Sequence, residues 1–136
     1  MKFQPDTPNG VNVITRQDPG RVWVGPTLFE SSLLVPWAGP VLPWPVHSFE
    51  ELNADLFEQI ALLDPELVIF GSGSRLRFPK PQWLQVLIGR RIGVETMDTP
   101  AACRTYNVLV SEQRSVVAAM IIEPGTASGA GSAKNL

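Results

Sequence analysis

Between residues 66 and 97 the sequence places two short apolar runs on either side of a helical pattern, and this spacing constrains the fold more than any other feature. Glu66–Phe70 (ELVIF) is typical of a buried strand, and Val94–Met97 predicts a second one. Pro81 suits the first turn of a helix between them. One face of this helix is formed by Trp83, Leu84, Leu87 and Ile88. Strand, helix and strand within about thirty residues predict one right-handed βαβ unit.

Two further helices and a last strand follow from the same kind of pattern. Ser48 and Glu51 form a capping box that predicts a helix ending near Leu63. Its buried stripe consists of Phe49, Leu52, Leu56, Ile60 and Leu63. Thr99 as N-cap, with a proline next to it, predicts a helix ending near Glu112. The last strand is expected at Val116–Ile122.

The N-terminal half has the pattern of strands. We expect these at Val11–Thr15, Arg21–Val24 and Thr27–Val35, with a hairpin turn at Gly25-Pro26. The fold class predicted is α/β: a single domain with a mixed central β-sheet, flanking helices and a β-rich N-terminal half. A chain of 136 residues fits one domain, which we place at residues 1–124. The small and polar residues 125–136 predict a disordered C-terminal tail.

Pro36–His47 is the segment with no regular pattern. It holds four prolines and two tryptophans, and prolines at this density exclude a helix. An edge strand remains compatible with them. The sequence leaves two roles open for this segment, an edge that covers the core or an exposed aromatic surface for a partner.

Composition excludes several classes of protein. The 11 basic and 13 acidic residues give a net charge of −2, which argues against a nucleic-acid binder. A single cysteine excludes an internal disulfide. No apolar run approaches the roughly 20 residues of a transmembrane segment. Pro5, Asp6 and Pro8 interrupt any secretory signal, so we expect a cytoplasmic protein.

Charge is uneven along the chain. Residues 22–74 hold seven acids and no Lys or Arg, whereas residues 75–136 hold eight basic residues and four acids. Folding either interleaves these blocks or leaves a bipolar surface that orients the protein on a partner.

One loop has the position of a ligand site. Gly71, Ser72 and Gly73 follow a buried strand, although the dinucleotide and P-loop patterns are both incomplete. The sequence favours a turn that needs a positive φ as the explanation of these glycines. If the two strands are parallel neighbours, the loop lies beside Asp98 and Thr99 at the carboxyl edge of the sheet. Candidate ligand-binding residues for a small anion at this edge are Gly71, Ser72, Gly73, Arg75, Arg77, Asp98 and Thr99.

No convincing catalytic set is visible. His47 is the only histidine and has no paired nucleophile in the sequence. Cys103 lies in the first turns of a predicted helix, where a small half-buried residue is its ordinary role. No Cys/His cluster has metal-ligand spacing. We therefore predict no catalytic residue, no metal and no cofactor, and lean towards a protein that is not an enzyme.

The stretch Asp98-Thr99-Pro100-Ala101-Ala102-Cys103, followed by Thr105-Tyr106-Asn107-Val108-Leu109, resembles a small family of α/β proteins. That family contains a mitochondrial respiratory complex I assembly factor and the adipogenesis-associated domain protein. Further matches, in order, are Gly39-Pro40, Trp44, Pro65-Glu66-Leu67, Ile69-Phe70-Gly71-Ser72-Gly73 and Gly93-Val94-Glu95. The resemblance covers roughly Gly10 to Pro124 and implies a mixed sheet with helices. It supplies no catalytic residues.

Two functions follow as hypotheses. The first, implied by the resemblance, is a non-enzymatic binding or assembly protein with a protein partner, related to respiratory complex I or membrane-protein assembly. The second is a small-molecule or anion-binding domain, an enzyme in one version, that uses the Gly71–Gly73 loop and the Thr99 helix N-terminus. The candidate motif surface is Ala102, Tyr106 and Asn107, the last two of which equally suit structural roles. The sequence specifies neither the partner nor the oligomeric state.

Overall fold

The computed structural model describes residues 10–124, so the tail predicted at 125–136 lies outside the described residues. Within this range the chain forms two β-sheets and three α-helices. The strands are β1 (Ile14–Asp18), β2 (Arg21–Val24), β3 (Thr27–Phe29), β4 (Leu33–Pro36), β5 (Leu42–Pro43), β6 (Leu67–Gly71), β7 (Gly93–Met97) and β8 (Val116–Met120). The helices are α1 (Ala54–Ala61), α2 (Gln85–Gly89) and α3 (Thr99–Ser111), with short 3₁₀ turns at Phe49–Glu51 and Pro81–Trp83.

The larger sheet has the strand order β5-β4-β8-β6-β7. β6 runs parallel to both of its neighbours, β7 and β8, whereas β4 runs antiparallel to β8. This arrangement confirms the predicted mixed sheet and the parallel βαβ unit. β6 lies between β7 and β8. The connection from β6 to its neighbour β7 contains α2, and the connection from β7 to β8, which passes over β6, contains α3.

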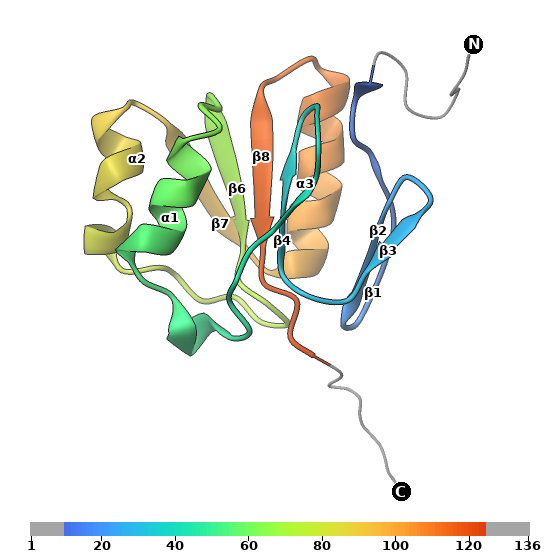
Figure 1. Cartoon of the computed structure of the whole chain (residues 1–136), viewed down its shortest axis with the longest axis horizontal. Coiled ribbons are helices and arrows are strands. Elements are labelled where there is room, and N and C mark those ends of the chain that lie inside the picture. The colour runs from blue at the N-terminus through green and yellow to red at the C-terminus, as the bar shows by residue number, and fades with distance from the viewer. Residues whose placement is uncertain (1–9, 125–136) are drawn as a thin grey trace, which may run out of the picture.

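Helices cover both faces of this sheet (Figure 1). α1 and α2 lie on one face, where Val68 and Phe70 of β6 join their apolar side chains in one core cluster. α3 lies on the other face, where Ile69 packs in a second cluster. β6 is buried on both faces, which explains why its sequence is a continuous apolar run.

The smaller sheet is the antiparallel sheet β1-β2-β3, which packs beside α3 (Figure 1). Its β2–β3 hairpin confirms the turn predicted at Gly25-Pro26. The single strand predicted at Thr27–Val35 is wrong, because the chain changes sheets at Ser32. That side chain is buried, and its Oγ accepts the Ile122 N–H at 2.9 Å. The first strand begins at Ile14, later than the predicted Val11.

The proline-rich segment closes the core, which decides between its two open roles. Trp44 is 2% exposed, and its Nε1 donates to the Leu56 carbonyl at 3.0 Å. Its ring makes edge-to-face contacts with Phe57 and Phe70, at centroid distances of 5.8 and 6.2 Å. Pro43 lies on the edge strand β5, where a missing N–H is tolerated.

α1 begins at Ala54, so the capping box predicted at Ser48 is wrong. Asn53 is the N-cap, and its Oδ1 accepts the Leu56 N–H at 3.1 Å. Glu51 instead accepts the His47 N–H at 2.8 Å, one residue before the predicted partner. The predicted apolar stripe is nevertheless the buried side of this region.

The acidic and basic segments of the chain meet in the fold. Arg77 pairs with Glu50 at 2.9 Å, and Arg114 pairs with Glu66 at 2.9 Å. At these two places folding brings the opposite charges together. None of the helices within residues 10–124 has the length and apolar character to cross a membrane.

Candidate functional site

The chain segments at the carboxyl ends of the parallel strands meet around one hydroxyl group, that of Thr99. This residue is 5% exposed. Its Oγ1 accepts the Gly73 N–H at 3.0 Å and donates to the Ile121 carbonyl at 2.8 Å. The Thr99 N–H donates to the Gly73 carbonyl at 2.8 Å. The ends of β6 and β8 and the start of α3 are therefore fixed to one another by hydrogen bonds.

The two glycines of the loop allow this close approach. Gly73 has a φ of +107°, which confirms the expectation of a turn that needs a positive φ. A Cβ at Gly73 would lie 2.9 Å from Glu123 Oε1. A Cβ at Gly71 would lie 3.0 Å from Thr99 Oγ1. A larger residue at Gly71 would push the loop away from α3, whereas one at Gly73 would displace the Glu123 side chain and strain the backbone.

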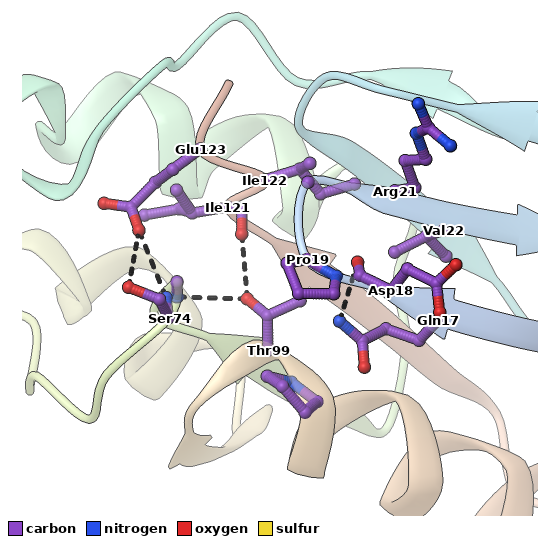
Figure 2. Close-up of a pocket in the computed structure, with 13 residues that line it drawn as sticks. Gln17, Asp18, Pro19, Arg21, Val22, Ser74, Thr99, Ile121, Ile122 and Glu123 are labelled. Carbon is purple, nitrogen blue, oxygen red and sulfur yellow. Dashed lines mark hydrogen bonds between the residues drawn. The ribbon is translucent and has the colours of Figure 1, made fainter. Parts of the chain in front are cut away.

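A cavity of about 230 Å³ opens between this junction and the turn of the β1–β2 hairpin (Figure 2). Its apolar walls are formed by Pro19, Val22, Pro100, Ile121 and Ile122. Polar lining is contributed by Gln17, Asp18, Arg21, Ser74, Thr99 and Glu123. The cavity lies beside the carboxyl ends of the parallel strands β6 and β8. Open α/β sheets bind ligands outside this edge.

A second cavity of about 270 Å³ adjoins the first and shares Gln17 and Pro100 with it. It lies between β1 and α3, and its remaining lining residues are Ile14, Thr15, Arg16, Cys103, Arg104 and Asn107. Two of these residues are arginines, and none is acidic.

The amide donors in the first turn of α3 are already bonded within the protein. Asp98 is the N-cap in place of the predicted Thr99, and its carboxylate accepts the Ala101 N–H at 2.9 Å. The Asp98 carbonyl accepts the Ala102 N–H at 2.9 Å. Pro100 has no N–H, and the Thr99 N–H reaches Gly73. An anion at this helix end would have to displace these bonds.

The structure brings the Gly71–Gly73 loop together with Asp98 and Thr99, but neither candidate arginine lines the cavity. Arg77 pairs with Glu50 and Glu123, at 2.9 and 3.2 Å, and lies over the ring of Phe49. Arg75 is exposed on the same loop. Ser72 Oγ donates to the Arg75 carbonyl and accepts the Arg77 N–H, which fixes the loop backbone.

The candidate motif surface connects α3 to the two sheets. Asn107 Oδ1 accepts the Ile14 N–H at 2.9 Å, and its Nδ2 donates to the Ile14 carbonyl at 2.7 Å. The Tyr106 hydroxyl lies 2.9 Å from the Asn12 carbonyl and 3.0 Å from the Pro36 carbonyl. Burial raises the pKa of Tyr106. Both side chains therefore serve the packing of α3 against β1 and β4.

The two groups considered as nucleophile or base have ordinary environments. The His47 side chain is 75% exposed and lies 3.2 Å from Glu51. Cys103 is 4% exposed, and burial raises the pKa of its thiol to about 12. Among residues 10–124 no cluster of three or more His, Cys, Asp or Glu side chains is arranged to hold a metal ion.

Sequence reasoning missed the opposite wall of the cavity. Pro19 and Gly20 in the β1–β2 turn, and Ile122 and Glu123 after β8, were assigned to no site. Pro19-Gly20 is a turn signal that points to a hairpin, but nothing in the sequence indicates that this turn faces the start of α3.

Comparison with known proteins finds one family. The model of the family described as protein of unknown function (DUF498/DUF598) matches residues 14–121. The NADH dehydrogenase (ubiquinone) 1 alpha subcomplex assembly factor 3 of Mus musculus is 34% identical over 125 residues. This match covers 90% of the present chain and 66% of the mouse protein, so the chain spans slightly less than two thirds of that relative.

Solved structures share the fold. The crystal structure of a Bordetella parapertussis protein has a TM-score of 0.81 and 35% identity, and the match covers 85% of this chain and 99% of that one. The solution structure of a Bordetella pertussis protein described as an Mth938-like domain has a TM-score of 0.78 and 29% identity. That match covers 91% of this chain and 94% of the other.

Proposed function

The chain belongs to the DUF498/DUF598 family, and from this membership we propose that it is an assembly protein without catalytic activity, which binds subunits of a respiratory NADH dehydrogenase before they are complete. The observation that carries the proposal is the 34% identity, over 90% of this chain, to a protein named as an assembly factor of that complex. Because the chain spans about two thirds of that relative, the activity is proposed for the shared region.

The chemistry of the described residues supports binding over catalysis. The buried thiol of Cys103 is almost fully protonated at neutral pH, because burial raises its pKa to about 12. The amides at the start of α3 are bonded to Gly73 and Asp98, which weakens the alternative of an anion or small-molecule site at the Gly71–Gly73 loop. A free cysteine fits a reducing compartment, so a cytoplasmic location is part of the proposal.

The test is affinity isolation from growing cells of the organism that encodes the chain. A tagged chain is crosslinked in the cell, isolated and compared with an unrelated tagged protein of similar size and charge. We expect NADH dehydrogenase subunits to be enriched with the tagged chain, as incomplete assemblies. Equal recovery of these subunits with the control protein would refute the proposal.

A further inference from the structure

We propose that the two adjoining cavities between the β1–β2 hairpin and the start of α3 form one docking groove for a protein partner. The partner supplies an extended segment with an apolar anchor side chain and a carboxylate within a few residues of it. This inference rests on the proposed function and adds the place and the chemistry of the contact. The groove is defined by the lining residues of the two cavities.

The first cavity suits one apolar side chain. Its volume of about 230 Å³ leaves room for one large side chain. Pro19 and Pro100 are the apolar lining residues that solvent reaches, and the buried side chains of Val22, Ile121 and Ile122 form the packed floor beneath them. Pockets of this kind receive the anchor residues that dominate the binding energy of protein interfaces.

Polar groups of the first cavity are largely engaged with one another. Thr99 Oγ1 is bonded to Gly73 and Ile121, and the Glu123 carboxylate accepts both the N–H and the hydroxyl of Ser74 at 3.1 Å (Figure 2). A polar ligand would have to break these bonds, whereas an apolar side chain leaves them intact.

The positive charge of the second cavity comes from Arg104, because the charge of Arg16 is paired with Asp18. Arg16 and Arg104 line it, and no carboxylate does. Arg16 pairs with Asp18 at 2.9 Å and lies over the ring of Trp23. Within residues 10–124 no ion pair is found for Arg104, whose side chain is exposed beside Cys103. A carboxylate of the partner segment complements this charge.

Hydrogen bonds connect the walls of the groove to one another. Asn107 fixes β1 to α3 through both the N–H and the carbonyl of Ile14. Thr99 fixes α3 to the ends of β6 and β8. A preformed groove reduces the ordering cost of binding, which favours capture of an extended partner segment.

The first test uses defined peptides and the amide NMR spectrum of the full chain. The probe is Gly-Ser-Asp-Phe-Glu-Ser-Gly, with one control that replaces Phe by Ser and one that replaces Asp and Glu by Asn and Gln. We expect saturable shifts at the lining residues with the probe, and affinity about tenfold weaker for each control. Absence of saturable shifts at millimolar probe, or shifts confined to other surfaces, would overturn the inference. N-acetylphenylalanine that binds as tightly as the probe would assign the groove to a small carboxylate instead.

Charge-reversal variants distinguish binding in the groove from general attraction between opposite charges. Arg104→Glu should weaken the probe about tenfold or more, whereas Lys80→Glu, the same charge reversal beside Trp83, should leave it unchanged. Equal weakening by both would mean non-specific attraction. Gln17→Trp fills the boundary shared by the two cavities, and its thermal unfolding controls for folding.

The Gln17→Trp variant also distinguishes a failure of the docking groove from a failure of the proposed assembly function. If the unmodified chain captures NADH dehydrogenase subunits and folded Gln17→Trp captures few of them, both proposals stand. Equal capture by the two chains would reject the groove and leave the assembly role. If the unmodified chain captures none, the assembly role fails, and the peptide titration alone decides the groove.

Discussion

Replacing Thr99 by Val tests the junction that shapes the candidate site. Valine has nearly the same shape as threonine but no hydroxyl. The Thr99 hydroxyl bonds the Gly73 N–H at 3.0 Å and the Ile121 carbonyl at 2.8 Å, and both bonds are buried. The substitution therefore leaves one backbone donor and one backbone acceptor without a partner, in a position that is 5% exposed.

The expected loss of stability follows from these two groups. Each buried polar group left without a partner costs about 1–3 kcal/mol, so Thr99→Val should lower the free energy of unfolding by about 2–6 kcal/mol. Thr99→Ser keeps the hydroxyl and removes one methyl group, which costs about 1 kcal/mol. The two variants therefore separate the hydrogen bonds from the apolar packing.

Urea unfolding, followed by tryptophan fluorescence, measures both values. We expect the midpoint of Thr99→Val to fall well below that of Thr99→Ser, with the same slope against urea. Hydrogen exchange should become faster at the Gly73 amide in the valine variant alone. A valine variant as stable as the serine variant would refute the claim that this hydroxyl connects the three segments.

Three further predictions concern single groups. Asn107→Ala should lower the free energy of unfolding by about 1–3 kcal/mol and speed hydrogen exchange in β1, because both bonds to Ile14 are lost; unchanged exchange there would contradict it. The Cys103 thiol should be inert to Ellman's reagent at pH 8 in the folded chain and react on unfolding in urea, because burial raises its pKa to about 12; rapid reaction of the folded chain would contradict its burial. The Glu66 carboxylate accepts the Ser115 N–H and pairs with Arg114. The first of these contacts, and then the second, lower the pKa of Glu66 below 4.5. The ionised Glu66 therefore stabilises the fold fully above pH 4.5, and this contribution is lost as the pH falls through the lowered pKa. In Glu66→Gln the melting temperature should consequently fall less steeply as the pH is lowered below 4.5.

Local patterns predicted the elements whose sequence agrees with their environment. The apolar run before Gly71 became β6, which is buried on both faces, and the alternation of runs and helices correctly indicated parallel strands. Helix starts were less predictable, because several residues near each start have capping side chains. Ser48 and Thr99 were chosen as caps, but Asn53 and Asp98 have the carboxylate or amide that reaches the first turn.

The cavity and its charge could not be read from the sequence. The hairpin turn at Pro19 faces residues about 80 and 100 positions away, and no local pattern encodes such a contact. The Gly71–Gly73 loop and Asp98 were correctly expected to meet, since parallel strands place their ends together. Sequence reasoning could not foresee that Gly73 and Thr99 would each donate a backbone hydrogen bond to the other.

The most direct measurement of the assembly role is the amount of complete NADH dehydrogenase in cells that lack this chain. Native gel electrophoresis of solubilised membranes, with an in-gel activity stain, separates the complete enzyme from its partial assemblies. We predict that deletion reduces the complete enzyme, accumulates partial assemblies and is reversed by the unmodified chain. The same amount of complete enzyme in deleted and normal cells would contradict the assembly role.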